Sequence, residues 1–416
     1  MRPASGNKLK IFNDPVYGFI NIPDESIFDI LETPYFQRLR NIKQLGMSHL
    51  VYPGALHTRF HHAMGAMYLM GQALEILRFK GHDITDKEAL AVTQAILVHD
   101  IGHGPFSHAL ENTLVDNIHH ERLTGMFMER LNETLPHSLD EAIQIYHNNH
   151  PKKYLHQLVA GQLDMDRIDY LNRDSFFTGV SEGVISWDRI IKMLNIAEDK
   201  LVIDEKGIYS IEKFLIARRL MFWQVYLHKT VIAAENMMVS ILKRAKELAL
   251  AGETLFATPP LTRFLHKHYS EYDFLNDNTL LEDYSLLDDA DIFSAIKTWT
   301  THDDPVLSFL CRSIVERKLF RIEMQHVPFT EEYEGDIRHL ATRQYPIPDE
   351  AAGYLVISGM ISNNAYDPDT GGIPVLSGDG TLIDIGKASD QLNINVLSQP
   401  VKKFFLCYPK SLITNT

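Results

Sequence analysis

Cysteine is almost absent from this sequence, with two residues in 416. Two cysteines exclude a disulfide framework and a metal site built from thiolates. No uninterrupted apolar run reaches the roughly 18 residues that a membrane span needs. Residues 1–18 lack the apolar core of a signal peptide. We therefore expect a cytoplasmic protein with no membrane partner.

Basic residues are also fewer than acidic ones. Lys and Arg together number 40 against 54 Asp and Glu, which gives a formal charge of −14. Nucleic-acid backbones bind basic protein faces, so nucleic acid is a disfavoured partner. The net charge does not exclude one basic pocket, so a small anionic ligand remains allowed. A hydrophobic fraction of 45% is ordinary for a globular protein, and the length allows two or three lobes.

Most of the chain has helical character. Apolar residues recur at helical spacing over 58–80, and Thr85 followed by Glu88 forms a capping-box pattern that predicts a helix over 85–100. The stretch 211–250 lacks glycine and proline and is apolar on more than one side, which predicts one long helix in the core or at a subunit contact. Further helices are predicted within 24–46, where Pro34 begins a second one, and over 120–133, 138–148, 154–171, 186–195, 260–268, 278–298 and 305–320.

The character of the sequence changes near residue 318. Short segments rich in β-branched and aromatic residues follow, separated by turn signals such as DPDTGG and SGDG. They are FRIEMQHV, GYLVISGMI, TLIDIG and KKFFLCYP. A two-stranded element is also predicted near 200–211. The expected fold class is therefore mostly α, with a helical domain over residues 1–320 and a smaller α+β region over 321–416.

Histidine is crowded into one part of the chain. Of 20 histidines, 13 fall between His57 and His156. Histidine is the commonest metal ligand and titrates near neutral pH, so this grouping indicates a metal or catalytic site, although a single histidine on a helix is more often a plain core or surface residue. A mixed imidazole–carboxylate set suits Mn, Fe, Co, Ni or Zn better than calcium or magnesium alone. The groups are TRFHHAMG (58–65), HDIGHGPFSH (99–108), HHE (119–121) and LDMDRIDYLNRD (163–174).

The adjacent residues His99 and Asp100 present a geometric problem, because neighbours on a regular helix point in different directions. They converge on one ion if the helix bends or ends there, which Gly102 and Gly104 permit. If the helix instead continues, His99 and His103 share one face.

The run HDIGHGPFSH, with a histidine upstream and an aspartate downstream, resembles the HD superfamily of metal-dependent phosphohydrolases. The similarity is closer to its deoxynucleoside triphosphate triphosphohydrolase branch. The runs that carry it, in the family's order, are IFNDPVYG (11–18), TPYFQRLRNIKQLG (33–46), YPGALHTRFHHAMG (52–65), LVHDIGHGPFSHALE (97–111), HHE (119–121), DMDRIDYLNRD (164–174) and VYLHK (225–229). The resemblance implies an HD-type helical catalytic domain with core motifs in 50–235. It also implies hydrolysis of a dNTP to a deoxynucleoside and inorganic triphosphate.

The same resemblance implies roles for the grouped residues. One divalent transition metal (Mn, Fe, Ni, Co or Zn), with Mg as an additional ion that the nucleotide can bring, would be bound by His62, His99, Asp100 and Asp166. The residues that would position water and the α-phosphate are His103, His120 and Glu121. His108 would donate a proton to the leaving 5′-oxygen, and Glu111, three residues away, would orient its imidazole.

Substrate and effector contacts are implied in the same way. Phosphate-holding positions are matched by Arg59, Arg167, Tyr170 and Arg218, and sugar-contacting positions by Asp174, Gln44 and Leu45. Tyr226 corresponds to the aromatic residue that packs under the deoxyribose and leaves little room for a 2′-hydroxyl. Positions that bind an activating nucleotide in relatives are matched by Lys10, Asn13, Gln37 and Arg40. The implied partners are a dNTP, a nucleotide effector and further copies of the chain in a dimer or tetramer.

The sequence departs from the family at a few positions and leaves alternatives open. His61 stands where relatives usually have Glu, Arg167 replaces a frequent Lys, and Glu32 stands where the effector site has Asp. An HD phosphohydrolase acting on another nucleotide or phosphoester, as a monophosphatase or phosphodiesterase, is one alternative. A non-catalytic nucleotide-sensing oligomer is another. The runs DMDRIDYLNRD and VYLHK favour the triphosphohydrolase, and the presence of His108 argues against a sensor.

Overall fold

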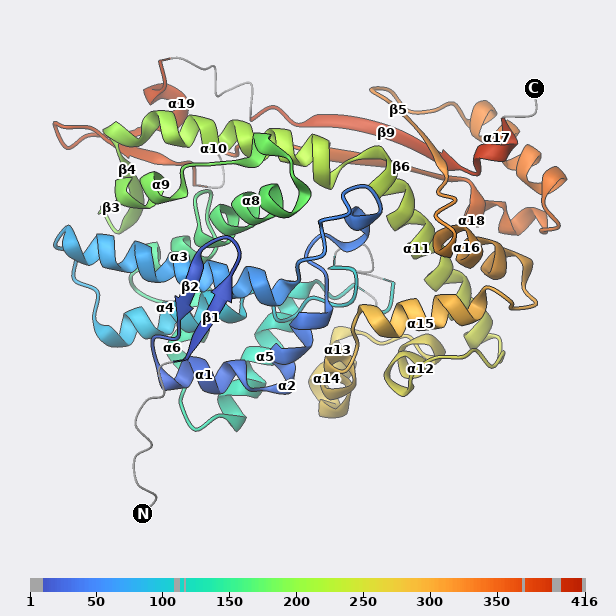
Figure 1. Ribbon diagram of the computed structural model, residues 1–416, viewed down its shortest axis with the longest axis horizontal. Coiled ribbons are helices and arrows are strands. Elements are labelled where there is room, and N and C mark those ends of the chain that lie inside the picture. The colour runs from blue at the N-terminus through green and yellow to red at the C-terminus, as the bar shows by residue number, and fades with distance from the viewer. Residues whose placement is uncertain (1–9, 108–112, 116, 369–370, 391–397, 414–416) are drawn as a thin grey trace.

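The computed structural model describes residues 10–107, 113–115, 117–368, 371–390 and 398–413 (Figure 1). It is mostly helical, as the sequence predicts. The hairpin β1 (Ile11–Asp14) and β2 (Gly18–Asn21) opens the chain. The helices of the first half are α1 (Glu25–Leu31), α2 (Pro34–Gln37), α3 (Arg59–Phe79), α4 (Asp86–Val98), α5 (His120–Thr134), α6 (Asp140–Tyr146), α7 (Lys153–Val159), α8 (Met165–Thr178) and α9 (Trp187–Met193).

The second half continues with helices and ends in strands. The helices are α10 (Ile208–Met221), α11 (Lys229–Leu250), α12 (Pro259–His266), α13 (Glu271–Asn276), α14 (Asn278–Ser285), α15 (Asp289–Trp299), α16 (Pro305–Val315), α17 (Glu331–Gln344), α18 (Ala352–Leu355) and α19 (Ile385–Ala388). The short 3-10 turns that matter below are η1 (Arg38–Asn41) and η2 (Gly46–Leu50).

Helix α3 lies at the centre of the first half and packs against both α4 and α8 (Figure 1). Its side chains are buried on several sides, including Met64, Met67, Leu69 and Ala73. Helix α4 begins at the predicted capping box, in which the Thr85 side chain accepts from Glu88 N and Glu88 Oε2 accepts from Thr85 N at 2.8 Å. The three helices that supply the candidate site are therefore fixed by the core.

Three of the predicted helices are wrong in extent, because capping residues inside them start new helices. Within 211–250, α10 passes into a π-helical turn (Phe222–Tyr226), and the His228 side chain then caps α11 by accepting from Thr230 N. Within 154–171, Asp164 caps α8, and within 278–298, Asp288 caps α15. A side chain that bonds the backbone locally competes with helix continuation, and apolar periodicity does not register it.

Two sheets include the strands predicted after residue 318. The first has the order β5 (Arg321–Gln325), β9 (Val401–Tyr408) and β6 (Ile357–Asn363), all antiparallel. The second has the order β3 (Leu194–Ala197), β4 (Lys200–Asp204), β7 (Pro374–Leu376) and β8 (Leu382–Asp384). The strand pair predicted near 200–211 thus lies at 194–204. Because β7 pairs in parallel with β4, the C-terminal region completes a sheet begun in the helical part.

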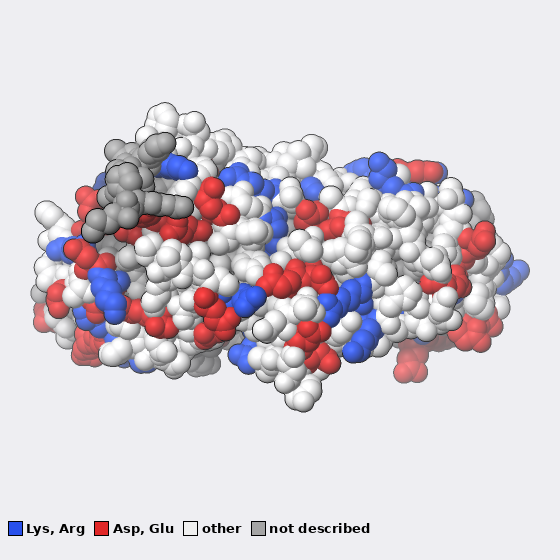
Figure 2. Space-filling model, turned by 90° about the horizontal axis from the view of Figure 1, so that it is seen from below, with Lys and Arg blue, Asp and Glu red and all other residues white. Residues whose placement is uncertain are grey.

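None of the described helices combines the length and apolar character that a membrane crossing requires. The face in Figure 2 carries Lys and Arg interspersed with Asp and Glu, without a continuous basic stretch.

Candidate active site

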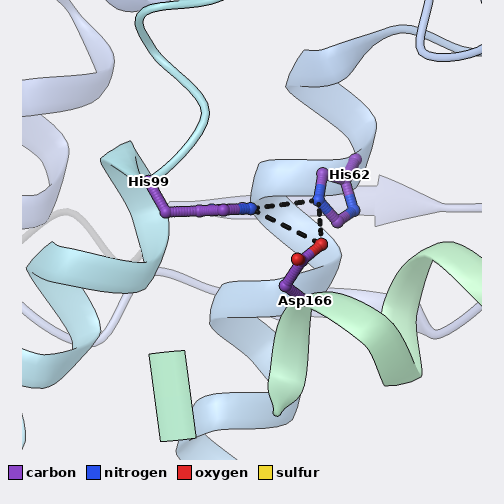
Figure 3. Close-up of side chains that lie close together, drawn as sticks. All are labelled: His62, His99 and Asp166. Carbon is purple, nitrogen blue, oxygen red and sulfur yellow. Dashed lines mark hydrogen bonds and ion pairs between the residues drawn. The ribbon is translucent and has the colours of Figure 1, made fainter. Parts of the chain in front are cut away.

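Three potential metal ligands from three elements converge in the core (Figure 3). His62 comes from α3, His99 follows the end of α4, and Asp166 lies in the first turn of α8. His62 Nε2 lies 3.1 Å from Asp166 Oδ1 and 3.3 Å from His99 Nε2, and His99 Nε2 lies 3.6 Å from Asp166 Oδ1. Two imidazoles and a carboxylate at this spacing fit a divalent transition metal.

Asp100 completes the predicted set of four. Its Oδ2 lies 3.7 Å from His62 Nε2, and its Oδ1 lies 3.4 Å from His99 Nε2. The Asp100 carboxylate also accepts a hydrogen bond from Arg59 Nη1. Asp100 therefore lies beside both imidazoles, although it groups more closely with His103 and His120 than with Asp166.

The end of a helix solves the geometric problem of His99 and Asp100. Helix α4 stops at Val98, so the two residues leave the helical path and turn toward the same point. Gly102 follows with no room for a side chain, because a Cβ there would lie 2.2 Å from the carbonyl oxygen of His120. Thr124 secures the turn by accepting from Gly102 N at 3.0 Å and donating to His99 O at 3.1 Å.

A buried series of ion pairs, formed by Asp169, Arg173 and Asp14, orients the ring of His62. His62 Nδ1 lies 2.8 Å from Asp169 Oδ2, which leaves Nε2 facing Asp166. Arg173 donates to both oxygens of Asp169 at 2.9 and 3.0 Å and to Asp14 Oδ2 at 2.7 Å. Such outer hydrogen bonds fix the tautomer of a ligating histidine. The sequence analysis missed Asp169 and Arg173, although they follow Asp166 at i+3 and i+7, a spacing that places them on one side of a helix.

The pKa values reflect this crowding of opposite charges. Burial lowers the pKa of His62, but its hydrogen bonds to Asp166 and Asp169 outweigh burial and raise the pKa to about 10. Burial raises the pKa of Asp100, but His99 and Arg59 outweigh it and hold that pKa well below its usual range. Burial and the charge of Arg59 hold the pKa of His103 well below its usual value. His103 is therefore a neutral imidazole at neutral pH.

The residues predicted to position water lie beside the ligands. His103 Nε2 is 3.4 Å from Asp100 Oδ1, and the rings of His103 and His120 stack at 3.7 Å. His120 Nε2 lies 3.5 Å from Glu121 Oε1. Asp100, His103 and His120 form a second group with metal-ligand spacing. The predicted proton donor His108 and its partner Glu111 lie outside the described residues.

The predicted phosphate-holding residues are held by different partners. Arg59 donates to Ser107 Oγ at 2.9 Å in addition to Asp100, and Arg167 donates to Asp164 Oδ2 at 3.1 Å. Arg218 donates through Nη1 to Ala365 O at 2.9 Å, which brings the C-terminal region to this side of the site. Arg218 Nε is buried and has no hydrogen-bond partner among the described residues. An unpaired buried donor is costly, so it favours an acceptor such as a phosphate oxygen.

The predicted sugar-contacting residues include two, Asp174 and Tyr226, that contact each other. Asp174 accepts from Tyr226 Oη at 2.8 Å, and the rings of Tyr226 and Tyr170 lie 6.1 Å apart, edge to face. Gln44 Oε1 is buried without a partner among the described residues, and Leu45, half-buried, follows it. His57 contacts Asp174 here, and the sequence analysis did not single it out.

His61 has a structural role that the sequence did not reveal. It occupies the third position of α3, where its Nδ1 accepts from Thr58 N at 3.2 Å and lies 2.9 Å from Thr58 Oγ1. This is a capping box with histidine at the position where glutamate or glutamine is usual. The departure from the family's Glu thus keeps an acceptor at the start of the helix that carries His62.

The residues predicted to bind an effector lie near the first hairpin. Lys10 Nζ lies 3.4 Å above the ring of Phe28, and Arg40 lies 3.6 Å above the ring of Phe60. Gln37 accepts from Arg40 Nε at 2.8 Å, and Asn13 lies in β1. An effector role for these residues stays a prediction.

Comparison with known proteins places the chain in a family. Residues 185–257 match the family described as HD associated region. The chain is 33% identical over 366 residues to the uncharacterized protein YwfO of Bacillus subtilis, covering 86% of this chain and 81% of that protein. It is 32% identical over 275 residues to the deoxynucleoside triphosphate triphosphohydrolase SAMHD1 homolog of Dictyostelium discoideum, covering 61% of this chain and 52% of that protein.

A solved structure is also similar over nearly the whole chain. It is a phosphohydrolase from Bacteroides thetaiotaomicron, with 52% identity and a TM-score of 0.93, covering 96% of this chain and 100% of that chain. These similarities confirm the resemblance that the HDIGHGPFSH run carries. The family implies a divalent metal, and His62, His99 and Asp166 form a group that could hold one. The chain belongs to the HD-domain phosphohydrolases and has a core similar to that of the SAMHD1 triphosphohydrolases.

Proposed function

We propose that this protein hydrolyses deoxynucleoside triphosphates to a deoxynucleoside and inorganic triphosphate. The observation that carries the proposal is the face of α8, where Asp166, Tyr170 and Asp174 recur at every fourth residue. At 1.5 Å per residue, Asp166 and Asp174 lie about 12 Å apart along the helix axis. One helix face thus presents a metal ligand, then an aromatic residue beside the arginines, then a carboxylate suited to a hydroxyl. This order supports a ligand with phosphates at one end and a sugar at the other.

The metal would be held by His62, His99, Asp100 and Asp166, with Mn, Fe, Co, Ni or Zn favoured by the mixed imidazole–carboxylate set. When bound, such an ion lowers the pKa of a coordinated water and neutralises phosphate oxygens. Arg59 would hold the Asp100 carboxylate in place by donating to its Oδ2.

The protein's own residues would do the rest. His103, neutral because burial and Arg59 depress its pKa, lies 3.4 Å from Asp100 and would help to orient a water beside that carboxylate. Arg218, with its buried Nε unpaired among the described residues, would bind a phosphate oxygen. His108, which lies outside the described residues, remains the proposed proton donor to the 5′-oxygen, because an alkoxide leaving group needs a proton near neutral pH.

Product analysis tests the proposal. Protein loaded with each metal in turn is incubated with each dNTP and rNTP, with and without GTP as a candidate effector, and products are separated by anion exchange. Release of deoxynucleoside and triphosphate is the expected result. Orthophosphate or a nucleoside monophosphate would instead indicate a different HD phosphohydrolase, and no turnover with any metal and nucleotide would refute an enzymatic role.

The metal ligands are tested separately. Asp166→Ala should lose bound metal by elemental analysis, because it removes one of the converging donors. Asp188→Ala, which removes an exposed carboxylate from α9, is the matched control and should keep the metal. Full metal content in Asp166→Ala would refute its role as a ligand.

A further inference from the structure

The carboxylate of Asp174 is buried between the side chains of His57 and Tyr226. His57 Nε2 lies 2.7 Å from Asp174 Oδ1, and Tyr226 Oη donates to Oδ2 at 2.8 Å. Asp174 is only 1% exposed and His57 only 2%. No Lys or Arg of the described residues pairs with this carboxylate. A buried carboxylate without a cation depends on hydrogen bonds for its stability.

The ring of His57 contacts Asp174 through one nitrogen only. Its Nδ1 is buried and has no hydrogen-bond partner among the described residues, whereas its Nε2 faces Asp174 Oδ1. A hydrogen on Nε2 is therefore the one that the ring can donate to the carboxylate. Phe177 stacks on the ring at a centroid distance of 4.5 Å and holds its plane. His57 is thus held in place as a donor to one oxygen of Asp174.

Tyr226 is the second fixed donor. Burial, together with the negative charge of Asp174, raises the pKa of Tyr226 well above its usual value, so the phenol keeps its proton and donates it to the carboxylate. A carboxylate has about four lone-pair sites, and two of them are taken here. The other lone pairs can accept from a neutral donor such as a hydroxyl, whereas an anionic phosphate would be repelled.

We propose that His57 is a positioning residue for the nucleotide sugar. It orients Asp174 so that a free lone pair of the carboxylate accepts a hydrogen bond from the 3′-hydroxyl of the deoxyribose. Through the other oxygen of Asp174, it also keeps the Tyr226 phenol in place. The inference deepens the proposed function and rests on it for the identity of the ligand.

The inference predicts that the effect of His57 depends on one substituent of the ligand. A 2′,3′-dideoxynucleoside triphosphate lacks the 3′-hydroxyl, so it gains nothing from an oriented Asp174. His57→Phe keeps the stacking on Phe177 but removes the donor. His57→Gln places an amide nitrogen near the position of Nε2 and keeps a donor to Asp174.

The test measures kcat and KM of the metal-loaded wild type, H57F and H57Q with a dNTP and with the matching dideoxynucleotide. We expect H57F to lower kcat/KM for the dNTP by about tenfold or more, because a hydrogen bond to a charged group is lost, and for the dideoxynucleotide by no more than about threefold. H57Q should recover most of the loss. Equal losses with both nucleotides, or H57Q as poor as H57F, would overturn the positioning role.

Two controls keep the outcome interpretable. Thermal unfolding and metal content establish that each variant is folded and loaded. If H57F does not fold, H57N takes its place, because its shorter amide does not reach Asp174, and the same pattern is expected. If the wild type releases no triphosphate from any dNTP, the proposed function fails on its own, and the same comparison is made on Kd by calorimetry. A dNTP-selective loss of affinity in H57F would then support the positioning role, and an unselective one would refute it.

Discussion

Glu235, on α11, gives a quantitative prediction about stability. Its carboxylate lies close to η2, where a Cβ added to Gly46 would be 3.6 Å from Glu235 Oε1. Burial raises the pKa of Glu235 from the usual 4.5 to about 8. The folded protein therefore prefers the protonated acid, whereas the unfolded chain loses the proton near its ordinary pKa.

The direction of the pH effect follows from linkage. Below pH 4.5 Glu235 is protonated in both the folded and the unfolded state, so it does not make the free energy of unfolding depend on pH. As the pH rises toward 8, the unfolded state gains from deprotonation and the folded state does not, so stability falls. One pH unit corresponds to about 1.4 kcal/mol, and the expected loss between pH 5 and pH 7 is about 2–3 kcal/mol.

The assay is urea unfolding from pH 5 to pH 8 at constant metal concentration, with the free energy of unfolding compared among three proteins. Glu235→Gln removes the titrating group, so its stability relative to the wild type should rise by about 2–3 kcal/mol between pH 5 and pH 7. Glu129→Gln, which removes an exposed carboxylate from α5, is the control and should parallel the wild type. A difference between Glu235→Gln and the wild type that stays constant within about 0.5 kcal/mol over this range would refute the reasoning.

Three further substitutions test the supports of the site by urea unfolding. His61→Ala should lower the free energy of unfolding by about 1 kcal/mol, whereas His61→Glu should not, because glutamate completes the capping box. Equal losses in the two variants would count against the capping role of His61. Arg173→Met should cost about 3–5 kcal/mol because it removes the cation that two buried carboxylates share, whereas Arg122→Met, in an exposed ion pair, should cost less than about 1 kcal/mol. Gly102→Ala should lower the free energy of unfolding by at least about 2 kcal/mol and weaken metal binding, because the added Cβ would overlap the start of α5. A variant with full stability and full metal content would refute this steric argument.

The convergence of His62, His99 and Asp166 was predictable, because motif runs and donor chemistry are local properties of the sequence. The helices α3 and α4 were also predicted close to their observed bounds. The three helix breaks were missed because each depends on one capping side chain, as at His228, rather than on periodicity.

The contacts that support the site from outside were harder to predict from the sequence, for a different reason. Arg173 reaches Asp14 across 159 residues, and His57 reaches Asp174 across 117. Spacing along a single helix reveals neither partner, because both contacts exist only after distant segments have packed. The same limit applies to Ala365, whose carbonyl oxygen holds Arg218 although it belongs to the C-terminal region.

The buried chain from His62 through Asp169 and Arg173 to Asp14 also bears on how the protein reaches its native state. Its last contact closes a loop of 159 residues, so it forms only after a large entropic cost of bringing the ends together has been met. High contact order of this kind slows folding. The orientation of His62 is thus tied to the docking of β1. A growing chain would complete this support only after α8 has been synthesised and packed against Asp14.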